Sequence, residues 1–232
     1  MSAPALATSY AAIAQADPDR PFVVAQLGQS LDGRIATPTG ESRWINRDAA
    51  LDHVHRLRAA VDAVVVGVGT VVADDPLLNV RRCEGRHPAR VVIDPRGRMP
   101  RDAKCLNDDG CRRLVFCNDG LPEFPSGVEV VGTAREGEAL SPLAIVDALF
   151  ARGLKRLLIE GGAWTVSSFI DADAVDRLHV LVAPMILGSG KTGLALKPIA
   201  RLSEARRPSA HVYILADGDV LFDCDLRQQI GA

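Results

Sequence analysis

The sequence has few aromatic residues, no dominant charge and no long apolar run. Phe, Trp and Tyr together make up only 4% of the 232 residues, and scarce aromatics beside abundant Val, Ala and Leu are typical of sheets buried beneath helices. The 27 Lys and Arg nearly balance the 29 Asp and Glu, for a formal net charge of −2. Without a basic field, electrostatic binding of nucleic acid is not expected. No apolar run approaches the roughly 20 residues of a membrane-spanning helix, so no membrane partner is expected either.

The five cysteines do not form a pattern that binds metal. No C-x-x-C occurs, and the spacing of Cys105, Cys111 and Cys117 matches no zinc site. The histidines and carboxylates show no metal-ligand spacing either, so we expect no metal. The N-terminus has no basic-then-apolar signal, and irregularly spaced cysteines suit a cytoplasmic protein that keeps its thiols reduced.

Strands and helices alternate along the chain, which predicts an α/β domain with a largely parallel or mixed sheet. Residues 1–20 are Ala-rich and are expected to form a loose or short helical lead-in. Because no linker interrupts residues 21–232, we expect them to form one domain. The segments expected as strands are 22–27, 64–66, 90–94, 113–117, 128–132, 156–159 and 178–186, with a closing hairpin of 211–215 and 220–226, and those expected as helices are 46–60, 142–154 and 164–170.

The stretch 61–81 has the plan of a ligand-binding edge. Its β-branched run predicts a strand covered on both faces, and Gly67 and Gly69 at the end of that strand would let a ligand approach bare backbone. Two acids, Asp74 and Asp75, follow before a proline stops regular structure. The alternative is a buried strand followed by an ordinary polar loop.

Two other glycine motifs look like nucleotide-binding loops but lack essential residues. The segment 188–192, G-S-G-K-T, resembles the end of a nucleoside-triphosphate loop, yet Met185 stands where such a loop requires glycine. The G-V-G of residues 67–69 resembles half a dinucleotide fingerprint, whose third glycine would fall at Val72. We expect the following Asp-Asp-Pro to prevent a helix from opening there, which argues against a standard Rossmann domain.

The strongest phosphate-binding signal is the segment 160–165, E-G-G-A-W-T. A buried strand passes through Gly161 and Gly162 into a helix, and the free backbone N–H groups at a helix start suit a diphosphate. The alternative is a tight strand-to-helix turn that binds nothing. Glu160 would lie at the carboxyl edge of the sheet, where ligands of α/β proteins bind, and would be able to accept hydrogen bonds from sugar hydroxyls.

Two pairs of arginines are candidates for binding anionic groups. Arg58, late in the first long helix, and Arg81 would clamp a substrate phosphate if both face the cleft. Arg96 and Arg98, after the third strand, are candidates for a cofactor 2′-phosphate. Solvated surface arginines are the alternative for both pairs.

Five segments together carry the pattern of a known family. They are S-L-D-G-R-I-A with G-E-S-R-W-I (30–36 and 40–45), G-T-V-V-A-D-D-P-L-L-N-V-R (69–81), V-V-I-D (91–94), L-I-E-G-G (158–162) and A-P-M-I-L-G (183–188). In this order they resemble the reductase domain of riboflavin biosynthesis, which is the C-terminal half of a bifunctional deaminase–reductase and has stand-alone archaeal and fungal relatives. The zinc deaminase signature, H-x-E with P-C-x-x-C, does not precede them.

This resemblance implies a dihydrofolate-reductase-like fold, a three-layer α/β/α domain with a mixed, mostly parallel sheet of eight strands, usually dimeric. It implies NADPH-dependent reduction of a phosphoribosylamino-pyrimidine to its ribitylamino product, with hydride delivered to ribose C1′ of the ring-opened imine. A separate deaminase would belong to the same pathway, and whether it acts before or after the reduction stays open. The alternatives are a same-fold NADPH reductase acting on another pterin-like or nucleoside-derived substrate, and a non-catalytic nucleotide-binding subunit of a deaminase complex.

The resemblance also implies site residues, among which we assign Asp74 and Glu160 as catalytic. Asp74 would orient the cofactor or substrate, and Glu160 would hold ribose hydroxyls. The sequence departs from the family at Gln26, where bacterial bifunctional relatives can carry Lys, and at Pro95, where relatives often have Ser near the cofactor. The expected cofactor-binding residues are Gly28, Trp44, Gly69, Thr70, Asp74, Arg96, Gly161, Gly162, Ala163, Trp164 and Thr165, the last four within a matching segment 162–168. The expected substrate-binding residues are Ser42, Arg58, Leu78, Arg81 and Glu160.

Overall fold

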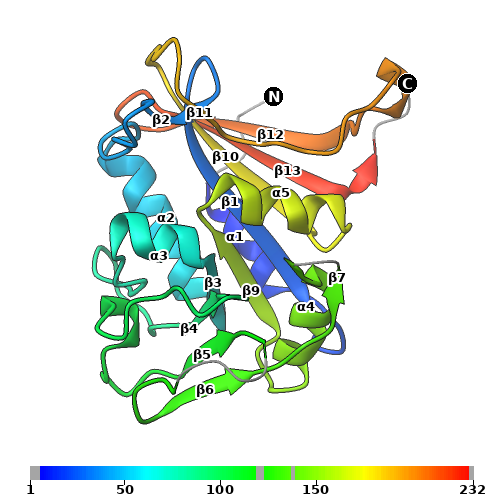
Figure 1. The fold of residues 1–232 in the computed structure, drawn as a ribbon. Coiled ribbons are helices and arrows are strands. Elements are labelled where there is room, and N and C mark those ends of the chain that lie inside the picture. Colours follow the sequence, from blue (N-terminus) through cyan, green and yellow to red (C-terminus); the bar gives the residue numbers. More distant parts are fainter. Residues whose placement is uncertain (1–5, 119–122, 137–138, 230–232) are drawn as a thin grey trace.

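The computed structural model describes residues 6–118, 123–136 and 139–229. The main strands are β1 (Phe22–Ser30), β3 (Ala63–Gly67), β4 (Ala89–Ile93), β5 (Arg113–Phe116), β6 (Val128–Val131), β9 (Arg156–Glu160), β10 (Arg177–Ala183), β12 (Pro208–Ile214) and β13 (Val220–Gln229). They form a nine-stranded sheet in the order β12-β13-β10-β1-β9-β3-β4-β5-β6 (Figure 1). The seven strands from β10 to β6 run parallel, whereas β13 runs antiparallel to both of its neighbours.

Helices cover both faces of this sheet (Figure 1). On one face lie α1 (Ala7–Ala14), α2 (Asp48–Ala60) and α3 (Val68–Asp74), and on the other lie α4 (Pro142–Phe150) and α5 (Ala163–Asp171). The smaller elements are the ribbons β2 (Arg34–Ala36) with β11 (Lys191–Thr192) and β7 (Arg135–Glu136) with β8 (Ala139–Leu140), and the 3-10 turns η1 (Lys104–Leu106) and η2 (Leu202–Glu204). The expected three-layer α/β/α architecture with a mixed, mostly parallel sheet is confirmed, with nine strands in the main sheet rather than eight.

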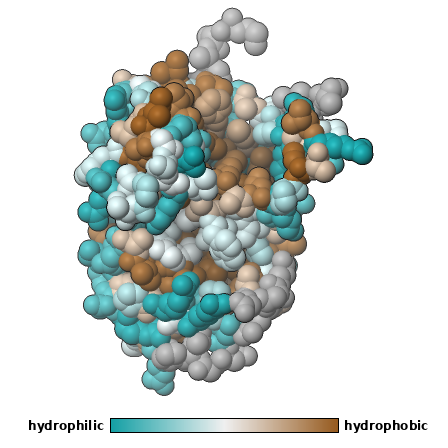
Figure 2. All heavy atoms as spheres, turned by 45° about the horizontal axis from the view of Figure 1, so that its top comes forward, coloured by the Kyte–Doolittle hydropathy of each residue, from teal (hydrophilic) through white to brown (hydrophobic). Residues whose placement is uncertain are grey.

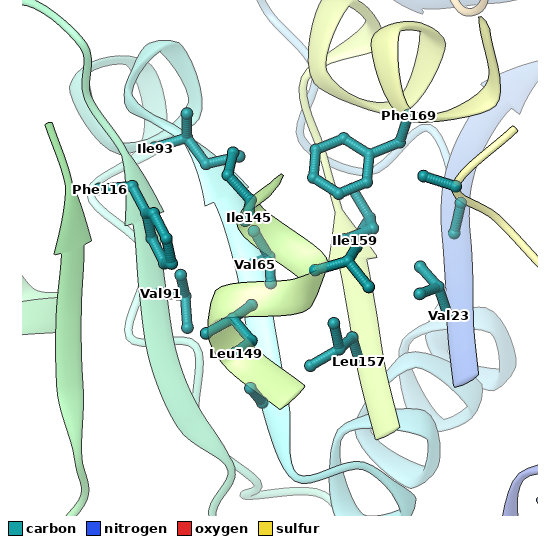
Figure 3. Packing of buried hydrophobic residues seen from close by; sticks show 14 of the residues in the cluster. Val23, Val65, Val91, Ile93, Phe116, Ile145, Leu149, Leu157, Ile159 and Phe169 are labelled. Atoms are coloured by element: carbon teal, nitrogen blue, oxygen red, sulfur yellow. The ribbon is translucent and has the colours of Figure 1, made fainter. Parts of the chain in front are cut away.

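Successive residues of each central strand enter different cores. Val23 and Val65 face the layer of α4 and α5, where Phe169 packs (Figure 3). Val24 and Val64 face the opposite layer of α1, α2 and α3. A strand that is buried on both faces has no polar alternation, which explains the unbroken apolar runs in the sequence.

The N-terminal segment contains a short helix, which is one of the two forms expected from the sequence, and this helix is docked on the domain. Residues 7–14 form α1, and Ile13 is fully buried in the core that α1 shares with α2. The hydroxyl of Tyr10 lies 2.5 Å from Nδ1 of His53 on α2. Ordered structure therefore begins before Pro21, because one large apolar side chain and a few polar contacts are enough to dock this Ala-rich helix.

A short helix follows the glycine break at the end of β3, so the expectation that the Asp-Asp-Pro sequence prevents a helix there is wrong. Helix α3 begins at Val68 and ends at Asp74, and Asp75, with a φ of 41°, caps it in the left-handed region. A proline restricts the residue before it and removes its own N–H, but leaves earlier residues free to be helical. Pro76 thus ends this helix rather than preventing it.

The start of α2 is held by the remote turn between β12 and β13. Asp217 accepts the backbone N–H of Ala49 at 2.8 Å, and the side chain of Asn46 donates to Asp219 at 3.1 Å. The Asn46 side chain also occupies the space that a Cβ at Gly28 would need. These contacts fix α2 against the carboxyl end of β1, where the candidate site lies.

Candidate active site

A large cleft lies at the carboxyl ends of four neighbouring parallel strands. Its volume is about 1020 Å³, and its lining includes Gly28 of β1, Glu160 of β9, Gly67 of β3 and Ile93 of β4. In the space-filling view, the molecule is hollowed where brown and white surface lies between hydrophilic teal rims (Figure 2). The carboxyl edge of a parallel sheet is where α/β proteins bind their ligands, so this cleft is the candidate active site.

Most of the residues expected from the sequence meet in this cleft. The two glycine breaks share it, since Gly69 and Gly161 both line it. The residues that line it as expected are Gly28, Ser42, Gly69, Thr70, Asp74, Leu78, Arg96, Glu160, Gly161, Gly162, Ala163, Trp164 and Thr165, whereas Trp44, Arg58 and Arg81 are not among its lining residues.

The loop after β9 requires glycine at two positions. Gly161 and Gly162 have φ values of 75° and 74°, in the left-handed region that side chains disfavour. A Cβ on Gly162 would lie 3.1 Å from the hydroxyl oxygen of Thr70, and a Cβ on Gly161 would lie 3.4 Å from the Thr70 methyl group. The loop after β9 and helix α3 are therefore in close contact, and the missing side chains leave bare backbone facing the cleft.

The first turn of α5 points into the same cleft. Gly162 is the N-cap of this nine-residue helix and supplies no side-chain cap. Ala163, Trp164 and Thr165, the first helical residues, all line the cleft. Uncapped N–H groups at a helix start carry partial positive charge and bind phosphate, so the geometry suits a diphosphate here.

Arg58 and Glu160 form a buried pair beside the cleft. Arg58 Nε donates to Glu160 Oε2 at 2.8 Å, Nη2 donates to Oε1, and Nη1 donates to the backbone oxygen of Asn79 at 3.0 Å. Burial disfavours the charged guanidinium, yet the facing Glu160 carboxylate outweighs this and raises the pKa of Arg58. Arg58 thus acts on the cleft through Glu160 and does not line it.

Arg81 and Trp44 are the other two expected residues that lie outside the lining. The Arg81 side chain donates to Asn79 Oδ1 at 3.1 Å, and its backbone N–H donates to His55 Nδ1 at 3.1 Å. Trp44 is 76% exposed and has a φ of 73°. Contact of either side chain with a ligand therefore requires the ligand to extend beyond the cleft, or the side chain to turn toward it.

The two acids of the A-D-D-P motif have different environments. Asp75 forms an ion pair with Lys104 at 3.0 Å and accepts the Lys104 N–H at 2.8 Å, which lowers its pKa. Asp74 lines the cleft and is exposed. Leu78, which follows the motif, is buried with a φ of 52°, a strained conformation of the kind found at ligand sites. Asp75 is therefore structural, and Asp74 is the acid available to a ligand.

The loop after β4 presents two cations. The buried carboxylate of Asp94 accepts the N–H groups of Arg98 and Met99 at 2.9 and 2.8 Å. This carboxylate shapes the loop so that Arg96 and Arg98 both line the cleft. An anionic group at the β4 end of the cleft would meet both guanidinium groups.

Comparison with known proteins decides the family. A family model described as the RibD C-terminal domain matches residues 21–207. The chain belongs to the RibD C-terminal domain family. It is 37% identical over 178 residues to the 2,5-diamino-6-ribosylamino-4(3H)-pyrimidinone 5′-phosphate reductase of Methanothermobacter thermautotrophicus, an alignment that covers 73% of this chain and 80% of the relative. The enzyme of the same name from Archaeoglobus fulgidus is 36% identical over 184 residues, covering 73% of this chain and 83% of the relative.

Solved structures agree with this assignment. A diaminohydroxyphosphoribosylaminopyrimidine deaminase/5-amino-6-(5-phosphoribosylamino)uracil reductase from Thermotoga maritima matches with a TM-score of 0.77 and 30% identity, over 89% of this chain and 57% of that longer chain. The riboflavin biosynthesis reductase of Saccharomyces cerevisiae shares the fold, with a TM-score of 0.72, 21% identity and coverage of 91% of each chain. The dihydrofolate-reductase-like fold implied by the sequence is confirmed, and this RibD C-terminal domain is an oxidoreductase, as its reductase relatives are.

The RibD C-terminal domain also has cleft residues that sequence reasoning did not assign. Gln26 is buried and lines the cleft, and it faces Glu160 in the register of β1 with β9. Lys191 and Thr192 line it as well. They belong to the G-S-G-K-T segment, which was set aside because it fails as a nucleoside-triphosphate loop. The signal that could have found them is their neighbourhood, since a strand ladder brings this segment beside residues 34–36.

Two observations concern partners other than nucleotides. Within the described ranges, no three His, Cys, Asp or Glu residues gather closely enough to hold a metal ion. None of the described helices has both the length and the apolar character to span a bilayer.

Proposed function

We propose that this protein is an NADPH-dependent reductase of riboflavin biosynthesis that converts a phosphoribosylamino-pyrimidine 5′-phosphate to its ribitylamino product. The observation that carries the proposal is that one cleft is lined by four features. They are the Gly161–Gly162 loop, the start of α5, Glu160 and Asp74. The archaeal relatives, named as 5′-phosphate reductases of this kind, support the substrate class. We further propose that the protein works in the cytoplasm as a homodimer, as the family resemblance implies.

The cleft fits a dinucleotide. The backbone at Gly161 and Gly162 is bare where a Cβ would crowd Thr70, so a diphosphate has room to approach the first turn of α5. Arg96 and Arg98 lie on the loop after β4. At the sheet edge, the loop after β3 separates this loop from the glycine loop after β9, and the two arginines would meet a 2′-phosphate. The volume of about 1020 Å³ lies at the upper end of the range of small-molecule and cofactor sites.

The chain's own groups would hold the substrate for hydride transfer. When bound, a reduced nicotinamide supplies the hydride that reduces C1′ of the ring-opened imine. Glu160, fixed by two hydrogen bonds to Arg58, would accept hydrogen bonds from ribose hydroxyls without losing its orientation. Asp74 would orient the cofactor or substrate, since it lines the cleft from the end of α3.

The decisive experiment measures oxidation of NADPH by the purified protein with both candidate substrates, the 2,5-diaminopyrimidinone and the deaminated uracil form of the ribosylamino 5′-phosphate. Turnover of either supports the proposal, and the preferred one fixes whether reduction precedes deamination. If the protein binds NADPH but turns over neither substrate, the result would instead support a reductase for another nucleoside-derived substrate. Turnover that appears only after a separate deaminase is added would support a nucleotide-binding subunit.

A further inference from the structure

Asp75 does not belong to the cleft that its neighbours line. Ala73, Asp74 and Pro76 are lining residues, whereas Asp75 is not. Its backbone lies in the left-handed region, with a φ of 41° and a ψ of 59°. Residues other than glycine disfavour this region, although Asp tolerates it when its short side chain can form hydrogen bonds. The contacts of the Asp75 side chain therefore help to hold the turn at the end of α3.

The Asp75 carboxylate binds both the backbone and the side chain of Lys104. It accepts the Lys104 N–H at 2.8 Å, and Lys104 Nζ lies 3.0 Å from Asp75 Oδ2. Lys104 is the first residue of η1 and is not a lining residue of the cleft either. We call these two contacts the Asp75–Lys104 clasp. The clasp joins the end of α3 to the segment that follows β4.

The turn η1 is itself anchored on the sheet. Two buried arginines, Arg90 on β4 and Arg113 on β5, lie opposite each other in the register of these strands. Arg90 Nη1 donates to the oxygen of Asn107 at 3.1 Å, and Arg113 Nη1 donates to the oxygen of Leu106 at 3.0 Å. The clasp therefore ties the end of α3 to a fixed part of the molecule.

The two elements that the clasp joins carry two of the expected cofactor-binding residues. Asp74 directly precedes Asp75, and Arg96 lies on the loop between β4 and η1. Both line the cleft. Met99 of this loop and Val71 of α3 lie in the same hydrophobic core, so the two elements also pack together. A shift of one element relative to the other would change the distance between an acid and a cation of the cleft.

The clasp is exposed, which limits its contribution to the stability of the fold. The side chains of Asp75 and Lys104 are 45% and 56% exposed, and ion pairs with such exposure contribute little to the free energy of unfolding. Their effect on binding can still be measured. If the clasp raises the fraction of molecules whose cleft is ready for a ligand, the apparent Kd falls by the same factor.

We propose that Asp75 is a positioning residue, which holds Asp74 and Arg96 in place for the cofactor through its contacts with Lys104. This inference rests on the proposed function, because it assumes that NADPH binds in the cleft. Asp75 does not touch the ligand. It keeps the end of α3 and the loop after β4 together before the ligand arrives, so that binding does not have to order them.

The test compares Asp75→Ala with Asp173→Ala, which is matched in backbone conformation and in ion pairing. Asp173 follows α5, has a φ of 53° and forms an ion pair with Arg206 at 2.6 Å, outside the cleft lining. Asp75→Ala raises the Kd for NADPH, measured by calorimetry, about 10-fold, because a charge-assisted hydrogen bond and an ion pair are lost. Asp173→Ala loses similar stability in urea denaturation but keeps the wild-type Kd. A wild-type Kd in Asp75→Ala overturns the proposal.

Two milder variants separate positioning from general damage to the fold. Asp75→Asn keeps an oxygen that can accept the Lys104 N–H, and Asn tolerates left-handed backbone, so this variant recovers most of the affinity. Lys104→Met removes only the ion pair and raises the Kd for NADPH about 2- to 5-fold. If Asp75→Ala does not fold, Lys104→Met decides, and an unchanged Kd in that variant overturns the proposal.

A measurement without cofactor keeps this test apart from that of the proposed function. If the wild-type protein does not bind NADPH, the proposed function fails by itself. Hydrogen exchange then tests the clasp at the N–H groups of Arg98 and Met99, which bind the Asp94 carboxylate in the loop after β4. These groups exchange faster in Asp75→Ala than in wild type and Asp173→Ala if the clasp holds the loop. Equal protection in all three proteins overturns the proposal.

Discussion

Arg58 on α2 and Glu160 at the end of β9 form a buried ion pair with two hydrogen bonds across the edge of the cleft. Their side chains are 8% and 14% exposed. The pair converts a carboxylate at the end of a strand into a fixed acceptor, because both of its oxygens are held by one planar guanidinium. It also joins the helix layer to the strand that leads into the glycine loop.

Removing Arg58 is expected to destabilise the fold strongly. Arg58→Met leaves the Glu160 carboxylate without a partner in a largely buried position, and breaking a buried pair in this way costs roughly 3–5 kcal/mol. Urea denaturation at neutral pH measures the loss in the free energy of unfolding. The matched control is Arg82→Met, whose ion pairs with Asp48 and Asp52 are more exposed and should therefore contribute much less to the free energy of unfolding. Equal losses in the two variants would contradict a structural role for the pair.

Arg81 gives a prediction about the substrate alone. We expect Arg81→Ala to raise the substrate KM about tenfold if the ligand extends to this arginine beside Asn79, since a charge-assisted hydrogen bond to a phosphate is lost. The Kd for NADPH, measured by calorimetry, should stay nearly constant. Arg82→Ala, the neighbouring exposed arginine, is the control. Loss of cofactor binding with an unchanged substrate KM would show that the assignment of Arg81 is wrong.

Residues of the candidate site that meet a requirement of the backbone were easier to predict from the sequence than residues whose role depends on a side-chain partner. Gly69, Gly161 and Gly162 could be recognised because a glycine at a strand end reports a local requirement of the backbone. The pairing of Arg58 with Glu160 could not be predicted, because their separation of 102 residues is closed only by the packing of α2 on the sheet.

The same reasoning explains why two features of the fold were not predicted. Docking of α1 depends on Ile13 entering a core whose other members come from distant strands, so the local Ala-rich composition gives no sign of it. The helix α3 was missed because Pro76 was taken to exclude helix before it as well as after it. In contrast, the apolar runs of β1, β3 and β9 were easy to recognise, since burial on both faces leaves a local signal.

Two glycines of the cleft offer a test that separates strain from ligand contact. Gly162→Ala places a Cβ at a φ of 74° and 3.1 Å from the Thr70 hydroxyl, so it should lower the free energy of unfolding by about 1–2 kcal/mol and weaken NADPH binding. A Cβ on Gly69 meets nothing within 4 Å. We therefore expect Gly69→Ala to keep nearly wild-type stability in urea denaturation yet to raise the Kd for NADPH, because the new methyl group enters the cleft. Unchanged affinity in Gly69→Ala would mean that the ligand does not approach this glycine.

A chain of buried polar side chains crosses the helix layer next to the site. Tyr10 Oη lies 2.5 Å from His53 Nδ1, His53 Nε2 lies 3.0 Å from His179 Nδ1, and His179 Nε2 lies 3.2 Å from Asp223 Oδ1. Both histidines are fully buried. Burial lowers the pKa of His53 to about 3. The network therefore ties α1 and α2 to the sheet with His53 in its neutral form.

This depressed pKa makes the stability of the fold depend on pH. The unfolded chain binds a proton at His53 near its ordinary pKa of 6.5, whereas the folded chain does so near 3. Between these values the unfolded state holds more protons, so stability is fully present above about pH 6.5 and is lost as the pH falls toward 3, with a slope of at most about 1.4 kcal/mol per pH unit from this residue.

Urea denaturation in steps from pH 7 to pH 5 measures the slope in wild type, in His53→Gln and in His211→Gln, an exposed histidine on β12. We expect the slope to become shallower in His53→Gln, because that variant removes a buried group with a depressed pKa, whereas His211→Gln changes an exposed side chain and should keep the wild-type slope. Equal slopes in all three proteins would contradict this prediction. They would show that the protonation of His53 does not differ between the folded and the unfolded state, and that His53 gives the stability no pH dependence.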